Sequence, residues 1–129
     1  MPFNINPGDT LLPKLNKHKQ TSHLWVVLTK PDEESGKTVI VNLTTKRDYS
    51  DSTTVLDKGD HPYINRPSVI NYAYTKLVKS DDLKKGIESG YIQPYSPFSL
   101  TILIKIQKGL LQSPHTPKKI INYCSSLFK

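Results

Sequence analysis

The chain has 129 residues, of which 36% are hydrophobic, and this length suits one domain with one core. No apolar run approaches the roughly 20 residues of a transmembrane helix, and the opening MPFNINPGD has neither the basic nor the apolar region of a secretion signal, so we expect no membrane association. The single cysteine, Cys124, excludes an intrachain disulfide and favours a cytoplasmic location. The net charge of +7 favours a polyanionic partner, unless it reflects only a lysine-rich surface.

Short apolar runs bounded by turn residues predict strands in the first two thirds of the chain. The runs are residues 8–12, 24–29, 38–43, 53–56, 68–72 and 74–78, the last of which either continues its predecessor or forms a strand of its own. Residues 57–67 are rich in Gly, Asp and Pro and are expected to form an ordered loop. Residues 14–20 are expected to form an exposed basic loop, in which Lys17 and Lys19 either contact phosphates or are merely solvated. Several short strands separated by turns indicate a small barrel.

The last third of the chain has helical signals. Residues 80–86 are expected to form one helical turn, with Ser80 as N-cap and Gly86 as the stop, and residues 90–95 a connection. Ser96-Pro97 is expected to start a helix that ends at Gln112, although the alternating isoleucines within it would also suit a strand. Thr116-Pro117 repeats the start signal and predicts a final short amphipathic helix.

The candidate chemistry centres on two histidines. If residues 24–29 and 38–43 pair as antiparallel neighbours, His23 lies near Thr44 and Thr45. A histidine can take or give a proton near neutral pH, as RNA cleavage by 2′-hydroxyl attack requires. The predicted set is His23 and His61 for proton transfer, Thr44, Thr45 and Ser68 for phosphate binding, and Lys46 or Arg47 for charge. Alternatively, each histidine has a structural role, which for His61 would be to fix its own turn.

Other reactive residues have simpler explanations. The histidines and the single cysteine show no zinc spacing, and we predict no metal and no cofactor. The carboxylates of Asp81 and Asp82 suit the positive start of a helix. Cys124 lies on an amphipathic segment, and we predict that it is buried rather than nucleophilic.

The order of these motifs resembles the MazF/PemK (Kid) toxin family. The resemblance runs from Gly8-Asp9 through residues 23–29, 39–45 and 68–72 to a closing helix. It implies a mainly β (α+β) fold, a small SH3-like β-barrel of about five to seven short strands with C-terminal helices. It also implies a homodimer and metal-free RNA cleavage, with the hydroxyl of Thr44 or Thr45 on the scissile phosphate. The family's catalytic arginine, in an Arg-Pro pair before the second strand, is replaced here by Ser22-His23. Either His23 substitutes as acid or base, or activity has been lost or changed.

These patterns lead to one functional hypothesis and one rival. The first is a cytoplasmic, toxin-like, metal-independent endoribonuclease that cleaves single-stranded RNA and is neutralised by a partner antitoxin. The rival is a non-catalytic barrel that binds nucleic acid or a protein target. In both, residues 1–129 form a single domain, with a barrel over about 8–78 and a helical part over about 80–129.

Overall fold

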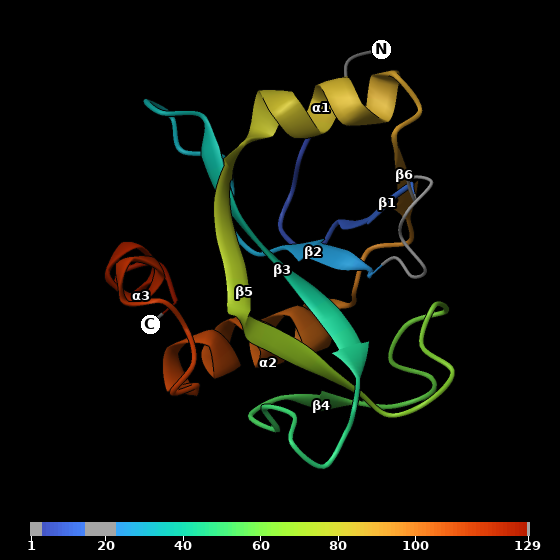
Figure 1. The fold of residues 1–129 in the computed structure, drawn as a ribbon. Helices are drawn as coiled ribbons and strands as arrows, with labels where there is room; N and C mark the ends of the chain where they lie inside the picture. Colours follow the sequence, from blue (N-terminus) through green and yellow to red (C-terminus); the bar gives the residue numbers. More distant parts are fainter. Residues whose placement is uncertain (1–3, 15–22, 129) are drawn as a thin grey trace.

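The computed structural model of the chain describes residues 4–14 and 23–128, which form a curled antiparallel sheet of six strands with three helices (Figure 1). The elements in order are β1 (Thr10–Pro13), β2 (Trp25–Val27), β3 (Lys37–Thr45), β4 (Val55–Leu56), β5 (Ser68–Lys79), α1 (Ser80–Glu88), β6 (Ile92–Tyr95), α2 (Leu100–Gln112) and α3 (Lys118–Cys124). The order across the sheet is β4-β5-β3-β2-β1-β6. The prediction of a mainly β fold is therefore confirmed. None of the helices described could span a membrane.

Strands β2 and β3 meet the condition on which the placement of His23 depends. The two strands are antiparallel, with Trp25 opposite Asn42 and Val27 opposite Ile40. The start of β2 therefore lies beside the end of β3, which is the arrangement that brings His23 towards Thr44.

Strand β5 is one long strand that bends in the middle (Figure 1). Its first part pairs with the end of β3 and its last part with the start of β3, and the register shifts between Ile40 and Asn42. Between the two paired parts, β3 has only Val41 whereas β5 has residues 72–75, which form a bulge. Within it, the Thr75 hydroxyl donates a hydrogen bond to the Tyr72 carbonyl at 2.7 Å. Because bulges bend strands, this insertion curls the sheet around α2.

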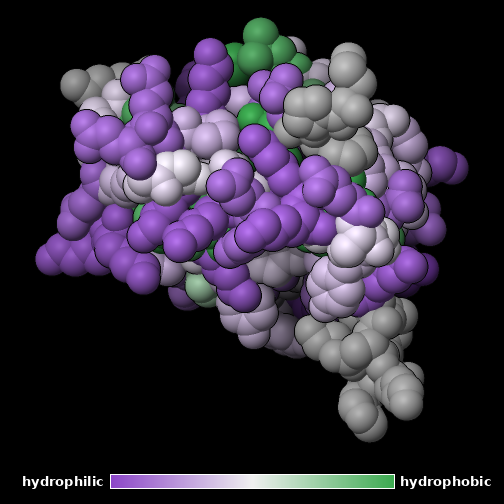
Figure 2. All heavy atoms as spheres, turned by 90° about the horizontal axis from the view of Figure 1, so that it is seen from above, coloured by the Kyte–Doolittle hydropathy of each residue, from purple (hydrophilic) through white to green (hydrophobic). Residues whose placement is uncertain are grey.

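Alternation along the strands divides the core between the two faces of the sheet. Val26 packs with the larger cluster, which includes Ile106 of α2 and Ile120 of α3. The next residue, Val27, faces the opposite way and packs with Leu83 of α1. Figure 2 looks onto the α1 side of the molecule, where hydrophilic side chains predominate. Helix α1 thus covers the smaller core and presents its polar side to solvent.

The boundaries predicted for α1 were wrong. Ser80 is the first helical residue and is buried, and the preceding residue, Lys79, is the N-cap without a side-chain cap bond. The helix continues through Gly86, which lies against Ile92 of β6, and ends at Glu88. The positive φ of 82° falls at Gly90, so Gly90 rather than Gly86 allows the chain to turn. As predicted, Asp81 and Asp82 lie in the first turn.

The predicted connection over residues 90–95 was also wrong, because it contains β6. Leu12 of β1 pairs with Gln93, and β6 closes one edge of the sheet. Pro94 lies in this strand, and an edge strand can accommodate a proline, which lacks an N–H group. The C-terminal third is consequently not purely helical, since it returns one strand to the sheet.

The starts of the last two helices differ slightly from the prediction. Helix α2 begins at Leu100, and its N-cap is Ser99 rather than Ser96, with the Ser99 hydroxyl accepting the Ile102 N–H at 3.3 Å. Helix α3 begins after Pro117, and the hydroxyl of Thr116 donates to the Leu110 carbonyl at 2.7 Å. Thr116 therefore anchors α3 to the end of α2.

Candidate functional site

A cavity of about 470 Å³ with polar and apolar lining residues opens where β3 ends and β5 begins. Its lining includes one histidine, two arginines and four hydroxyl side chains, and among the described residues it contains no carboxylate. The lining residues are His23, Leu24, Leu43, Thr44, Thr45, Arg47, Tyr63, Ile64, Asn65, Arg66 and Ser68.

Strand pairing brings the two sides of the cavity together. Thr44 and Thr45 at the end of β3 pair with Val69 and Ser68 at the start of β5. The ladder continues beyond the strands, because the Lys46 N–H donates to the Pro67 carbonyl at 3.0 Å. Residues that follow β3 are therefore held against those that precede β5.

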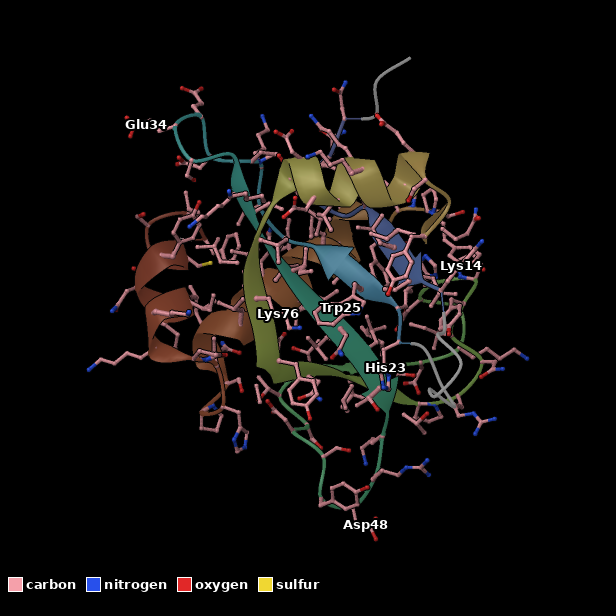
Figure 3. All side chains as sticks on the ribbon, turned by 45° about the horizontal axis from the view of Figure 1, so that its top comes forward. Lys14, His23, Trp25, Glu34, Asp48 and Lys76 are labelled. Atoms are coloured by element: carbon pink, nitrogen blue, oxygen red, sulfur yellow. The ribbon has the colours of Figure 1, made fainter. Side chains whose placement is uncertain are left out.

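His23 is held at the rim by the backbone of β3. Its Nδ1 lies 3.1 Å from the Leu43 carbonyl oxygen. Because a carbonyl oxygen only accepts, Nδ1 must carry the hydrogen, and the neutral ring then has a lone pair on Nε2. The side chain is exposed, and it lies beside the end of β3 (Figure 3). The neutral His23 ring therefore has the tautomer that a general base needs, with the Nε2 lone pair free of this hydrogen bond.

The charge of the cavity suits an anion. Arg47 and Arg66 approach it from the segments that follow β3 and precede β5. Guanidinium groups bind phosphate through paired N–H donors. The Ser68 hydroxyl already donates to the Arg66 carbonyl at 3.1 Å, so the hydroxyls of Thr44 and Thr45 are the better placed donors for a ligand. A phosphodiester would meet cations and hydroxyls here without a nearby carboxylate in the described lining.

The structure brings together five of the residues predicted for the site: His23, Thr44, Thr45, Arg47 and Ser68. Lys46 is exposed and is not part of the lining, although it neighbours two residues that are. Lys17 and Lys19 lie outside the described residues.

His61 does not line the cavity and has a structural environment instead. Its side chain is 4% exposed. Nδ1 accepts the Tyr63 N–H at 3.0 Å, and Nε2 lies 2.6 Å from the Ser96 carbonyl oxygen, to which it must donate. The ring also contacts Phe98 with the centroids 4.8 Å apart. Since both ring nitrogens have protein partners, the geometry favours the alternative in which His61 fixes its loop.

Sequence reasoning missed Tyr63, Asn65 and Arg66, which come from the loop before β5. The sequence did contain a signal for the position of Arg66. Arg66 precedes Pro67, and a residue before proline prefers an extended backbone, which is the conformation that leads into a strand. Pairing residues 38–43 with residues 68–72 would have placed this arginine beside the end of β3.

The other reactive residues of the sequence have structural roles. As predicted, Cys124 is buried in the larger core cluster, and burial raises the pKa of its thiol to about 11, so it is not a thiolate at neutral pH. Within residues 4–14 and 23–128, no group of three His, Cys, Asp or Glu side chains could hold a metal ion.

Gly8-Asp9 precedes β1 and is hydrogen-bonded to Val27 at the end of β2. Gly8 has a positive φ of 95°, and its N–H donates to the Val27 carbonyl at 2.7 Å. The Asp9 carboxylate accepts the Asn6 N–H at 2.9 Å. Burial raises the Asp9 pKa, and this hydrogen bond only partly offsets the increase. The dipeptide that contributes to the family resemblance is therefore a turn in this structure.

A scan against protein-family models matches none of them to this chain, and a search of curated proteins finds no match either. The resemblance to the MazF/PemK family consequently rests on the residues quoted for it.

Proposed function

We propose that this protein is a metal-independent endoribonuclease that cleaves single-stranded RNA in the cavity between β3 and β5. The observation that carries the proposal is the lining of this cavity, which brings together a histidine hydrogen-bonded to the Leu43 carbonyl, two arginines and two threonines. Such a set can bind a phosphodiester and move a proton without a metal.

The proposed reaction is a transesterification. Nε2 of His23 takes the proton of a 2′-hydroxyl group, and the oxygen attacks the adjacent phosphorus. The bond from phosphorus to the 5′-oxygen breaks, leaving a 2′,3′-cyclic phosphate and a 5′-hydroxyl that takes its proton from solvent. Arg47 and Arg66 offset the charge that grows on the phosphoryl oxygens, and the hydroxyl of Thr44 or Thr45 donates a hydrogen bond to one of them. Lys46 contributes only long-range attraction.

The fold and partners in this proposal follow the family resemblance. The curled sheet is consistent with a small SH3-like barrel, and Gly8-Asp9 occupies the turn before its first strand. A toxin of this kind would be cytoplasmic and homodimeric, and its activity would be blocked by an antitoxin. Because the cavity lining is cationic, an acidic segment of the antitoxin would occupy the same space as RNA.

The test is incubation of the purified protein with a long single-stranded RNA in EDTA, beside the His23→Ala variant. General acid–base catalysis typically contributes about 10²- to 10⁴-fold to a rate, so we expect the variant to lose cleavage to that extent. A His61→Ala variant separates the two histidines, because we expect it to retain the chemical step when RNA is saturating. Equal cleavage by wild type and His23→Ala would contradict the assigned role of His23.

The second candidate is a non-catalytic module that binds nucleic acid through the same cavity. One observation favours it, namely that His23 is the sole histidine among the described lining residues, so the leaving group has no second imidazole to protonate it. A binder would show no cleavage in either sample, and its affinity for RNA would fall steeply with added salt.

A further inference from the structure

Two tyrosines lie at the edge of the cavity with much of their surface open to solvent. Tyr63 is 42% exposed and lines the cavity, and Tyr95 of β6 is 46% exposed. Their ring centroids are 6.1 Å apart, and the ring planes are tilted by 47°. Large aromatic faces that are neither buried nor covered are available to a ligand.

Both tyrosines are held by His61, although they come from distant parts of the sequence. The Tyr63 N–H donates to Nδ1 of His61 at 3.0 Å. Nε2 of the same ring donates to the carbonyl of Ser96, the residue after Tyr95, at 2.6 Å. The Thr10 hydroxyl donates to this carbonyl as well, at 2.7 Å. One buried imidazole therefore fixes the loop that carries Tyr63 relative to the strand that carries Tyr95.

The backbone on each side adds rigidity. Tyr95 pairs with Thr10 in the sheet, and the Ile64 N–H donates to the His61 carbonyl at 2.9 Å. A binding surface that is already ordered loses little conformational entropy when a ligand arrives. The two rings therefore form a pre-organised pair beside the arginines of the cavity.

Exposed aromatic rings next to a cationic groove are the combination that binds single-stranded nucleic acids, since any base can stack on a ring while its phosphates meet the cations. Trp25 is a weaker candidate for such stacking, because the Lys76 ammonium already lies 5.4 Å from its ring centroid. Both residues are labelled in Figure 3.

We propose that Tyr63 and Tyr95 form a stacking platform for the bases of a single RNA strand whose phosphate occupies the cavity, and that His61 is the positioning residue of this platform. The inference rests on the RNA-binding part of the proposed function and is independent of cleavage.

The test is equilibrium binding at one fixed salt concentration of two labelled oligomers, a single-stranded RNA and an abasic ribose-phosphate chain of the same length. Stacking on an aromatic side chain is worth about 1–3 kcal/mol per base, so we expect Tyr63→Ala or Tyr95→Ala to weaken RNA binding at least fivefold. Affinity for the abasic oligomer should not change. Tyr63→Phe and Tyr95→Phe should bind RNA like wild type, because the ring is kept.

Tyr74→Ala is the matched control. Tyr74 is 59% exposed on β5, and it belongs neither to the cavity lining nor to the tyrosine pair. We expect its removal to change neither affinity. A loss equal to that of Tyr63→Ala would show a nonspecific effect of exposed tyrosines and would overturn the platform.

His61 is tested in the same assay by a double-mutant cycle. We expect His61→Ala to weaken RNA binding but not abasic binding, and to have no further effect once both tyrosines are alanine. A loss of affinity for both oligomers would overturn the positioning role. Should His61→Ala unfold in circular dichroism, His61→Phe takes its place, since its ring fills the same space but can make neither hydrogen bond.

The outcomes also separate this inference from cleavage. Base-dependent binding without RNA cleavage would support the platform and leave the protein as a binding module. Cleavage with tyrosine variants that bind both oligomers like wild type would overturn the platform alone. Failure of the wild-type protein to prefer RNA over the abasic oligomer would also overturn it.

Discussion

Strand β5 connects two regions in which polar side chains gather. One is a buried hydrogen-bond network that stabilises the fold, and the other is the open cavity of the candidate site. In the middle of the strand, the Tyr72 hydroxyl donates to the Ile106 carbonyl at 2.8 Å and lies 2.7 Å from the Thr54 hydroxyl. At the start of the strand, Arg66 and Ser68 border an open cavity of about 470 Å³. In the first region the polar groups are buried and hydrogen-bonded to one another, whereas in the second the arginines line a cavity that is open to solvent.

The difference follows from burial. An unpaired polar group in the core is costly, so the hydroxyl of Tyr72 must have partners, and burial raises its pKa so that it stays neutral. At the cavity, water provides the hydrogen-bond partners of the polar groups until a ligand replaces it. We therefore expect changes in the first region to lower the free energy of unfolding, and changes in the second to lower affinity without affecting stability.

The largest effect on stability is expected for Gly109→Ala. Alanine in a helix interior ordinarily stabilises by roughly 1 kcal/mol relative to glycine. Here an added Cβ would overlap the Thr54 hydroxyl and the Tyr72 hydroxyl, so α2 would have to move away from β5. We expect a net loss of about 3 kcal/mol in the free energy of unfolding, measured with urea.

Gly86→Ala is the matched control for this substitution. Its Cβ would meet only the Ile92 side chain, so a shift of this one side chain opposes the gain in helix propensity. We expect a change of less than about 1 kcal/mol. Similar losses for Gly86→Ala and Gly109→Ala would contradict the role assigned to the contact between Gly109 and Tyr72.

In the cavity, the largest effect is expected for Arg66→Ala. A hydrogen bond to a charged group is worth about 1.5–3 kcal/mol, which corresponds to a 10- to 150-fold loss in RNA affinity. The slope of log affinity against log salt should become shallower by about 1, because one phosphate contact is lost. Stability in urea should not change. A Lys108→Ala variant on the exposed side of α2 is the control, and an equal loss there would mean that only net charge matters.

The sequence predicts those features of the fold that are determined by neighbouring residues, and it fails for those that depend on contacts between distant segments. The β-branched runs of β2 and β3 were recognised, since their pattern lies within each strand. The strand β6 was missed, because Pro94 obscures it and its partner β1 is distant in the sequence. The candidate site shows the same limit. His23 was placed near Thr44 by one antiparallel pairing, whereas Arg66 required the pairing of β3 with β5.

His61 illustrates the limit most clearly. A histidine in a Gly-Asp-His-Pro loop suits either catalysis or turn formation, and both were open from the sequence. The partner that favours one of them, the Ser96 carbonyl, is far along the chain and becomes a neighbour only when β6 joins β1. No local pattern encodes that contact.

A smaller effect on the core is expected for Tyr72→Phe. The substitution keeps the ring and removes the hydroxyl that joins Thr54 of the loop to Ile106 of α2. Leaving the Thr54 hydroxyl without this partner should cost about 1–2 kcal/mol. Urea unfolding of Tyr74→Phe, whose ring is 59% exposed, gives the baseline. A loss for Tyr72→Phe no larger than this baseline would mean that packing of the ring, and not its hydroxyl, holds α2 on the strand.

The smallest effect is expected at Asp51, where the chain after β3 meets the end of α2. Burial raises the pKa of Asp51, but hydrogen bonds from the Ser113 hydroxyl at 2.6 Å and from Thr53 outweigh it, and the net pKa is lowered. A carboxylate with a lowered pKa stabilises the fold above its unfolded pKa of about 3.9, and this contribution is lost as the pH falls through the folded pKa.

Asp51→Asn tests this pH dependence, because asparagine keeps an acceptor but has no charge. Solvent screening of this largely accessible carboxylate limits the effect, and we expect Asp51→Asn to be less stable than wild type by about 0.5–1 kcal/mol at pH 6. The difference should shrink as the pH falls below about 4, because the unfolded wild-type carboxyl is protonated first and the folded one follows at its lower pKa. Urea unfolding of both proteins across this range measures it. A difference that stays constant with pH would show that the shape of the side chain, and not its charge, fastens the end of α2 to the segment after β3.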